Sequence, residues 1–176
     1  LGTVQKENNT YTMWYTALAP DLSDWQSIYA TSEDGIDWQD QGLLPGLSLG
    51  QPGSWDDFGI IFLNVLHRDD RYEVWYGGRS TAGQQDIGYA VSDDGINWNK
   101  ISTEQPVLSS GDAGEWDDFV AGTPFVLCEG AQYKMWYGGS NSSLSYKIGY
   151  ATSETVPDLQ IAGKIAFPSH RDGNGE

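Results

Sequence analysis

Hydrophobic and polar positions follow each other in short runs along this chain, and the runs return with a fixed period. The aromatic run Y-x-[MV]-W-Y occurs three times, and its copies begin 61 residues apart at Tyr11, Tyr72 and Tyr133. A second run, Y-A-[TV]-S, follows each copy, and its apolar and polar residues alternate as in a half-buried strand. A constant period of this length indicates a repeat architecture.

Each repeat is predicted to hold four short strands. Apolar runs at Gly59–Leu66 and Val120–Leu127 precede the aromatic run, and their continuous hydrophobicity predicts burial on both faces. The Asp-Gly pairs in SEDGIDW and SDDGINW predict hairpin turns, because glycine accepts the positive φ that such turns need. The strand after the second turn is predicted to end near Pro106–Leu108, where proline suits an outer edge. Since no segment has a helical period, the chain is predicted to be all-β.

Four antiparallel strands with large aromatics at fixed positions describe a β-propeller blade. A two-sheet sandwich or a parallel stack is the alternative, but neither predicts a period this constant. We therefore expect three blades over residues 1–157, at about 1–50, 51–111 and 112–157. Residues 158–176 are expected to form a strand or tail, or the start of a further repeat.

Three blades cannot close a ring alone, because closed propellers use about 4–8 blades to protect their sheet edges. The chain lacks an initiator Met and begins at a predicted inner strand. Two explanations stay open. Two copies related by a twofold axis would give six blades, or the chain is a piece of a longer, roughly five-bladed protein.

The chain carries 25 acidic and 9 basic residues, a formal net charge of −16. This charge excludes nucleic acid and anionic membrane surfaces as partners, and no apolar run is long enough to span a bilayer. Cys128 is the single cysteine, and we expect it to be a buried small hydrophobe. Neither His67 nor His170 has Cys, Asp or Glu at metal-ligand spacing, so no metal site is predicted, although Arg171–Glu176 loosely resembles a Ca²⁺ loop.

The motif W-D-D-F supplies the candidate catalytic acids, since a desolvated carboxyl beside an aromatic can act as a general acid. A catalytic group is needed once, whereas this motif occurs in both complete repeats, so a role in joining blades is favoured. The alternative is catalysis, which requires acids of neighbouring blades to converge on the central funnel. The candidates are Asp56, Asp57, Asp117 and Asp118.

The motif S-x-D-G-x-x-W also repeats, at Ser32–Trp38 and Ser92–Trp98. Its Asp side chain can accept hydrogen bonds from its own turn while the Trp covers the hairpin, so we expect a structural role. It resembles the Asp-box turn of sialidase-type propellers, but it is one residue shorter.

Aromatic residues make up 13% of the chain, and sugar rings stack on such side chains. Most of them recur at blade-core positions. Trp25 and Tyr146 have no repeated counterpart and are predicted to lie just before the third strand of their blades, which makes them better candidates for a ligand surface. Loop packing is the alternative, and it is the favoured account of each. Trp55 and Trp116 of the W-D-D-F motifs are further candidates.

Taken together, Y-x-M-W-Y-G-G, I-G-Y-A-x-S-x-D-G-x-x-W, P-V-L and W-D-D resemble the arabinanase/levansucrase/invertase superfamily of five-bladed propellers. That superfamily includes glycoside hydrolase families 43 and 32 and related glycoside phosphorylases. The resemblance covers Leu1 to about Pro157 and implies a carbohydrate ligand and an extracytoplasmic location. Its hydrolases carry catalytic carboxylates on the inner strands, and the equivalent positions here are Thr123-Pro124, Phe62-Leu63 and Leu1-Gly2, without an acid.

We therefore expect a carbohydrate-binding or carbohydrate-processing propeller that lacks a complete catalytic carboxylate set in this chain. Two alternatives stay open: an active glycosidase of the family 43/32 type that uses the W-D-D-F aspartates, and a non-catalytic protein-interaction scaffold. Gly163–Glu176 also resembles the opening of a TolB-type propeller repeat, which favours the longer-chain explanation.

Overall fold

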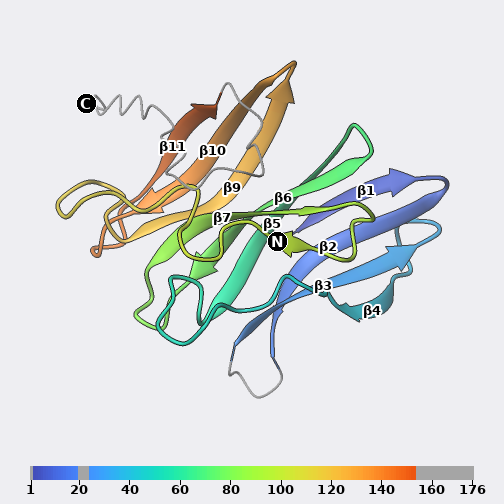
Figure 1. Ribbon diagram of the computed structural model, residues 1–176, viewed down its shortest axis with the longest axis horizontal. Coiled ribbons are helices and arrows are strands. Elements are labelled where there is room, and N and C mark those ends of the chain that lie inside the picture. Colours follow the sequence, from blue (N-terminus) through green and yellow to red (C-terminus); the bar gives the residue numbers. More distant parts are fainter. Residues whose placement is uncertain (1, 20–23, 154–176) are drawn as a thin grey trace.

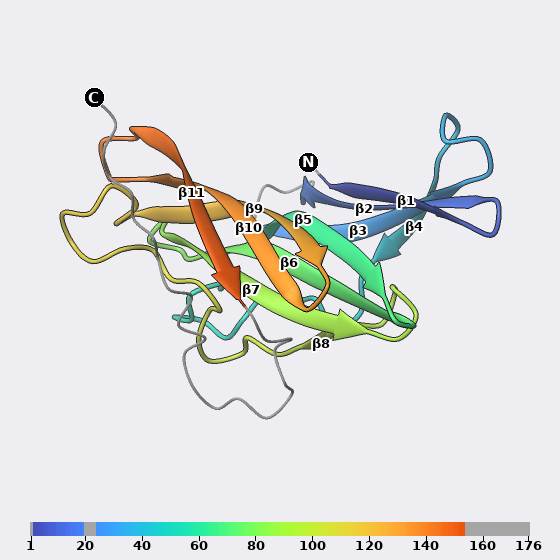
Figure 2. The ribbon, with the colours of Figure 1, turned by 90° about the horizontal axis from the view of Figure 1, so that it is seen from above.

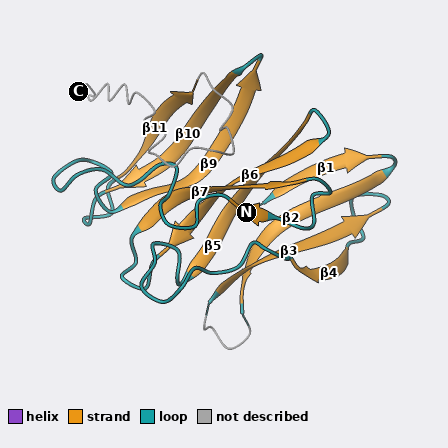
Figure 3. Ribbon diagram, in the orientation of Figure 1, coloured by secondary structure: helices purple, strands orange, loops and turns teal. Residues whose placement is uncertain are grey.

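The computed structural model describes residues 2–19 and 24–153, and in these ranges it contains strands and turns but no helix (Figure 3). Accordingly, none of these residues belongs to a helix long and apolar enough to cross a membrane. The prediction of an all-β chain is confirmed. The expected tail, its Ca²⁺-like loop and its TolB-like segment lie outside the described residues.

In the part of the chain that the structure describes, eleven strands form three successive antiparallel units. Blade 1 contains β1 (Thr3–Glu7), β2 (Thr10–Leu18), β3 (Trp25–Ser32) and β4 (Gln39–Leu43); blade 2 contains β5 (Gly59–Arg68), β6 (Arg71–Arg79), β7 (Gln85–Ser92) and β8 (Asn99–Lys100); blade 3 contains β9 (Val120–Glu129), β10 (Gln132–Ser140) and β11 (Tyr146–Ser153). The outer strand of blade 2 is shorter than expected, because beyond Lys100 only an isolated bridge, Ile87 with Leu108, continues the pairing among the described residues.

Neighbouring blades meet edge to edge through single parallel bridges. Trp25 at the start of β3 bridges to Gly59, and Gln85 at the start of β7 bridges to Val120. The blades therefore fan out in sequence order, from the blue first blade through the green second to the orange third (Figures 1 and 2). This arrangement is an incomplete β-propeller.

The hydrophobic core lies between the blades, and the repeated tryptophans fill it. Trp14 of blade 1 packs 6.0 Å from the ring of Tyr72 in blade 2, and its Nε1 donates a hydrogen bond to the carbonyl of Gly95 at 2.6 Å. Trp75 of blade 2 packs in the same way, 5.4 Å from Tyr133 of blade 3. Residues at the same position of the repeat, which we call residues of equal phase, thus form the same contact in both places. We call the contact between blades 1 and 2 the first seam and that between blades 2 and 3 the second seam.

The outer face of blade 3 carries the same residues but is exposed. Trp136 lies 5.2 Å from Tyr150, as Trp75 lies 5.0 Å from Tyr89, yet Trp136 is 36% exposed and Trp75 only 3%. Ile148 is 79% exposed, although Ile87 at the same phase is fully buried. Blade 3 therefore presents an unfilled seam, because among the described residues no further blade follows it.

Candidate functional site

The inner strands β1, β5 and β9 are tied together around the propeller axis by side chains of equal phase. The Thr3 hydroxyl donates to the Leu63 carbonyl and accepts from the Val65 amide, both at 3.0 Å. One repeat later, Asn64 Oδ1 accepts from the Val126 amide at 2.9 Å. The described inner strands of neighbouring blades do not pair through a backbone ladder. These side-chain hydrogen bonds connect them instead and stabilise their packing around the axis.

Each of the two complete inner strands has a bulge at the same phase. Phe62 and Thr123 adopt φ values of 56° and 48°, and the ladder register shifts beside both. Left-handed backbone is rare for an aromatic residue and an outlier for a β-branched one. Such bulges re-aim side chains near functional sites. At Thr123 the conformation is supported by its hydroxyl, which accepts a hydrogen bond from the Gly138 amide at 3.1 Å.

The bulges border a cavity of about 330 Å³, which we call the axial pocket. The positions matched by resemblance to the catalytic carboxylates of glycoside hydrolases come together in its wall. None of the described lining residues carries a carboxyl group. They are Gly2, Thr3, Phe62, Leu63, Asn64, Thr123, Pro124 and Phe125. An apolar wall with a few polar groups and this volume is typical of a small-ligand site.

The first W-D-D-F corner engages both of its aspartates. Asp56 is fully buried, and its carboxylate lies 2.6 Å from Lys100 Nζ and accepts a hydrogen bond from the Ser54 hydroxyl at 3.0 Å. Asp57 accepts from the amides of Gly53 and Thr81, each at 2.7 Å, and these two hydrogen bonds lower the pKa of its carboxyl. Neither side chain belongs to the axial pocket.

The second corner is built alike. Asp117 is buried and accepts a hydrogen bond from the Tyr137 hydroxyl at 2.9 Å. Asp118 accepts from the Gly114 amide at 2.8 Å, as Asp57 does from Gly53. The axial pocket does not include this pair either.

Trp55 and Trp116 lie flat on the tyrosines of their own blades. The ring centroids of Trp55 and Tyr76 are 5.8 Å apart, and those of Trp116 and Tyr137 are 5.9 Å apart. The second glycine of each Y-G-G run makes room for them, since a Cβ on Gly78 would collide with Trp55. Both tryptophans also pack against the hydrophobic clusters between their blade and the preceding one.

Trp25 and Tyr146 occupy equivalent positions, so the interpretation that they have no counterpart is wrong. Each begins the third strand of its blade rather than preceding it, opposite Leu18 and Ser140 respectively, and Gln85 takes the same place in blade 2. Trp25 lines a separate cavity of about 280 Å³ beside the segment that follows β4. Tyr146 is exposed on blade 3. The structure does not bring the two together.

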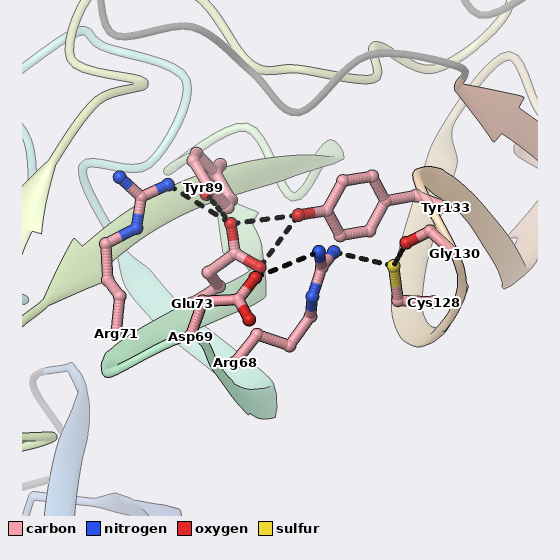
Figure 4. Close-up of polar contacts among 8 residues, drawn as sticks. All are labelled: Arg68, Asp69, Arg71, Glu73, Tyr89, Cys128, Gly130 and Tyr133. Atoms are coloured by element: carbon pink, nitrogen blue, oxygen red, sulfur yellow. Dashed lines mark hydrogen bonds and ion pairs between the residues drawn. The ribbon is translucent and has the colours of Figure 1, made fainter.

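Cys128 also differs from expectation, because it is partly rather than fully buried. Its thiol accepts a hydrogen bond from Arg68 Nη1 at 2.6 Å, and Arg68 belongs to a polar cluster that also contains Arg71, Glu73 and Tyr133 (Figure 4). Sequence reasoning missed this cluster, although its charged residues depart from the repeat. Within the described residues, no group of three or more His, Cys, Asp or Glu is placed to hold a metal ion.

No family model matches the chain. Two curated relatives, uncharacterised proteins from two strains of Mycobacterium tuberculosis, are 31% identical over 133 residues, which is 73% of this chain and 40% of each relative. The chain thus spans about two fifths of the length of these relatives.

Solved structures show the same fold at low identity. A family 117 glycoside hydrolase from Zobellia galactanivorans superposes with a TM-score of 0.73 at 18% identity, covering 97% of this chain and 54% of that one. The N-acetylgalactosamine deacetylase of Flavonifractor plautii, in complex with blood group B trisaccharide, superposes with a TM-score of 0.67 at 18% identity, covering 86% and 49%. The described part of the chain therefore shares its incomplete propeller fold with these solved structures.

Proposed function

We propose that this chain is part of a carbohydrate-binding propeller and that the axial pocket holds the sugar. The observation that carries the proposal is the pair of left-handed bulges, Phe62 and Thr123, at the wall of that pocket. Strained backbone of this kind clusters at ligand sites, because the surrounding fold maintains a geometry that the chain does not prefer.

The lining suits a sugar ring chemically. Phe62, Pro124 and Phe125 offer apolar surfaces on which the C–H face of a pyranose or furanose can pack. Thr3 and Asn64 place a hydroxyl and an amide beside them. Proteins with this fold include one solved with a trisaccharide bound, which supports a glycan ligand.

The lining of the axial pocket also supports sugar binding without hydrolysis, because it lacks carboxyl groups among the described residues. Glycoside hydrolysis normally needs two carboxyl groups about 5–10 Å apart across the scissile bond. The described pocket wall has none, and Asp56 is engaged by Lys100. These contacts support a structural role for the W-D-D-F aspartates.

Calorimetric titration of the full chain with arabino-, fructo- and manno-oligosaccharides tests the proposal. We expect one class to bind, and Phe62→Ala to weaken it about tenfold or more, because a stacked ring contributes roughly 1–2 kcal/mol. Ile36→Ala is the matched control, since Ile36 is an exposed apolar residue outside the pocket. Equal loss in both variants, or no binding by any class, contradicts the proposal.

An active glycosidase is the second candidate, and the buried carboxyl of Asp117 beside a tryptophan is the observation that favours it. Product analysis after incubation with the same sugars, repeated with Asp117→Asn, decides between the two roles. Lost turnover with unchanged melting supports catalysis. Lowered melting without turnover in either protein supports the structural role.

A protein-interaction scaffold is the third candidate, because the outer face of blade 3 is apolar and exposed. The alternative that we propose for this face is a further blade, supplied by a second copy of the chain or by more of a longer one, and that blade would remove the argument for a scaffold. The extracytoplasmic location implied by the sequence resemblance fits a glycan ligand.

A further inference from the structure

The turn between β5 and β6 borders a third cavity, of about 300 Å³, that is distinct from the axial pocket and from the cavity beside Trp25. Its lining residues carry charged or hydroxyl groups, unlike most of those in the axial pocket, and Figure 4 shows these side chains. Five residues line it: Arg68, Asp69, Arg71, Glu73 and Tyr133. We call this the arginine pocket.

Its charged residues break the repeat. At the phase of Arg68, the other blades carry Glu7 and Glu129, and at the phase of Glu73 they carry Thr12 and Lys134. The charges of this pocket therefore distinguish the second seam from the first, at positions that join the blades in both.

Glu73 forms the fixed floor of the pocket. It is buried, and it accepts hydrogen bonds from the hydroxyls of Tyr89 at 2.6 Å and Tyr133 at 2.9 Å, with Arg71 Nη2 3.3 Å away. Burial, and then the charge of Glu73, raise the pKa of both tyrosines, so both remain hydrogen-bond donors at neutral pH. The carboxylate is held from several sides, and this limits its movement.

Arg68, by contrast, has no buried acceptor oxygen in its hydrogen bonds and ion pairs with the described residues. In the first seam Glu7 accepts from His67 Nδ1 and from the Tyr72 hydroxyl, both at 2.6 Å. In the second seam Arg68 and Cys128 take the places of Glu7 and His67, so the guanidinium donates to a sulfur, which is a weak acceptor.

Among the described residues, Arg68 forms an ion pair with Asp69. The distance from Arg68 Nη2 to Asp69 Oδ2 is 3.5 Å, and the Asp69 side chain is 90% exposed. A solvent-exposed ion pair of that length contributes little. Each guanidinium has five N–H donors in a planar fork, and the described contacts of Arg68 and Arg71 use few of them. Donors of this kind match carboxylate and sulfate oxygens.

We propose that the arginine pocket binds a small oxyanion, namely the carboxylate or sulfate group of an acidic sugar unit. Arg68 is its main partner and Arg71 a second donor, while Asp69 is displaced toward solvent. The cavity volume is in the range of small-ligand sites. The net charge of −16 does not prevent this, because at physiological salt charges are screened beyond about 8 Å.

To test the proposal, the full chain is titrated separately with glucuronate, sodium sulfate and glucose at constant ionic strength. Backbone amide chemical shifts measured by NMR report binding. We expect glucuronate and sulfate to shift the amides of 68–73 and glucose to leave them unchanged. Arg68→Gln should weaken glucuronate at least tenfold, which corresponds to about 1.4 kcal/mol. Asp69→Asn should tighten it, because it removes the competing carboxylate.

Lys147→Gln is the control, because it removes the same charge from an exposed site on blade 3. Equal weakening in Lys147→Gln, or an unchanged affinity in Asp69→Asn, would attribute the effect to net charge and overturn the proposal. So would shifts caused by glucose, or no shift with glucuronate at about 10 mM. Sulfate binding alone would overturn the acidic-sugar assignment. These residues are separate from the axial pocket, so either proposal can fail without the other.

Discussion

Phe62 and Thr123 hold left-handed backbone conformations that cost about 1–3 kcal/mol each for side chains other than glycine. Elsewhere on the inner strands, the equal-phase residues Thr3 and Asn64 make hydrogen bonds that explain their presence. Phe62 has no polar side-chain atom to make such a bond, and its half-buried ring lines the axial pocket. The ring therefore fits a role in binding, and its removal should affect ligand and stability differently.

Phe62→Gly separates the two roles. Glycine adopts positive φ at no steric cost, which offsets the lost side-chain contacts, so the free energy of unfolding should change by no more than about 1 kcal/mol. Sugar affinity should fall at least tenfold, because the stacking surface is gone. Urea unfolding and calorimetric titration of the same protein measure the two effects. A loss of stability well above that range, with affinity intact, would make Phe62 a scaffold residue.

Asp56 and Lys100 form a buried pair in which each partner depends on the other. Asp56→Asn should lower the free energy of unfolding by about 3–5 kcal/mol, because the ammonium group is left without its counter-charge. The double variant Asp56→Asn with Lys100→Met should recover part of that loss. Asp57→Asn, on the neighbour that has only hydrogen-bond partners among the described residues, should cost clearly less than Asp56→Asn. Equal costs at both aspartates, measured by urea unfolding, would refute the buried-pair account.

The hairpins after the third strands depend on Asp34 and Asp94. Asp94 Oδ1 accepts hydrogen bonds from the amides of Ile96 and Asn97, and the Asn97 side chain donates to its second oxygen at 2.7 Å. The Asn97 side chain and these amides lower the pKa of Asp94. Asp34 makes the backbone contacts, and its pKa is lowered too, first by the amides of Ile36 and Asp37.

Acid should therefore weaken the fold through these turns. Because the folded pKa values lie below the unfolded value of about 3.9, the contribution is present above about pH 4 and is lost as the pH falls below it. Melting temperatures measured from pH 7 to pH 2 should drop in this window. Asp94→Asn should flatten the drop more than Asp34→Asn, since Asp94 has an additional donor. Parallel curves for the wild type and Asp94→Asn would contradict this.

The strands and hairpins were predictable because local chemistry specifies them: an aromatic run with period two, Asp-Gly at the turn, and a constant spacing. The bulges at Phe62 and Thr123 were not, since their φ depends on the facing strand and leaves no mark in composition. Nor was the equivalence of Trp25 with Tyr146, because Gln85 at that place in blade 2 breaks the aromatic pattern. The axial positions follow from the family resemblance. No local motif marks the arginine pocket, whose charged residues differ from the residues at the equivalent positions of the other blades.

The three blades repeat one joint, and its residues behave alike wherever a following blade is present. Trp14 and Trp75 are both buried against the tyrosine of the next blade, whereas Trp136 has no such partner among the described residues. Trp136 is thus more exposed than Trp14 and Trp75 because the seam beside it is unfilled. This difference is compatible with a radial arrangement of the blades.

The exposed outer face of blade 3 should make the isolated chain associate in solution. Apolar side chains gathered on one face favour contact with another surface, and Ile148 is the most exposed of them. Sedimentation velocity from about 1 to 100 µM should show a mass that rises with concentration, and Ile148→Lys should suppress it. Ile36→Lys, an equally exposed residue on the blade 1 turn, should not. A constant monomer mass, or equal suppression by both variants, would contradict this role of blade 3.

The most direct test of the central claim is a map of where a sugar touches the protein. Backbone amide NMR during titration with the best-binding oligosaccharide should show the largest shifts at residues 2–3, 62–64 and 123–125, which come from three different blades and meet at the axis. Shifts confined to the W-D-D-F corners at 54–58 and 115–119, or to the exposed aromatic residues of blade 3, would contradict the account.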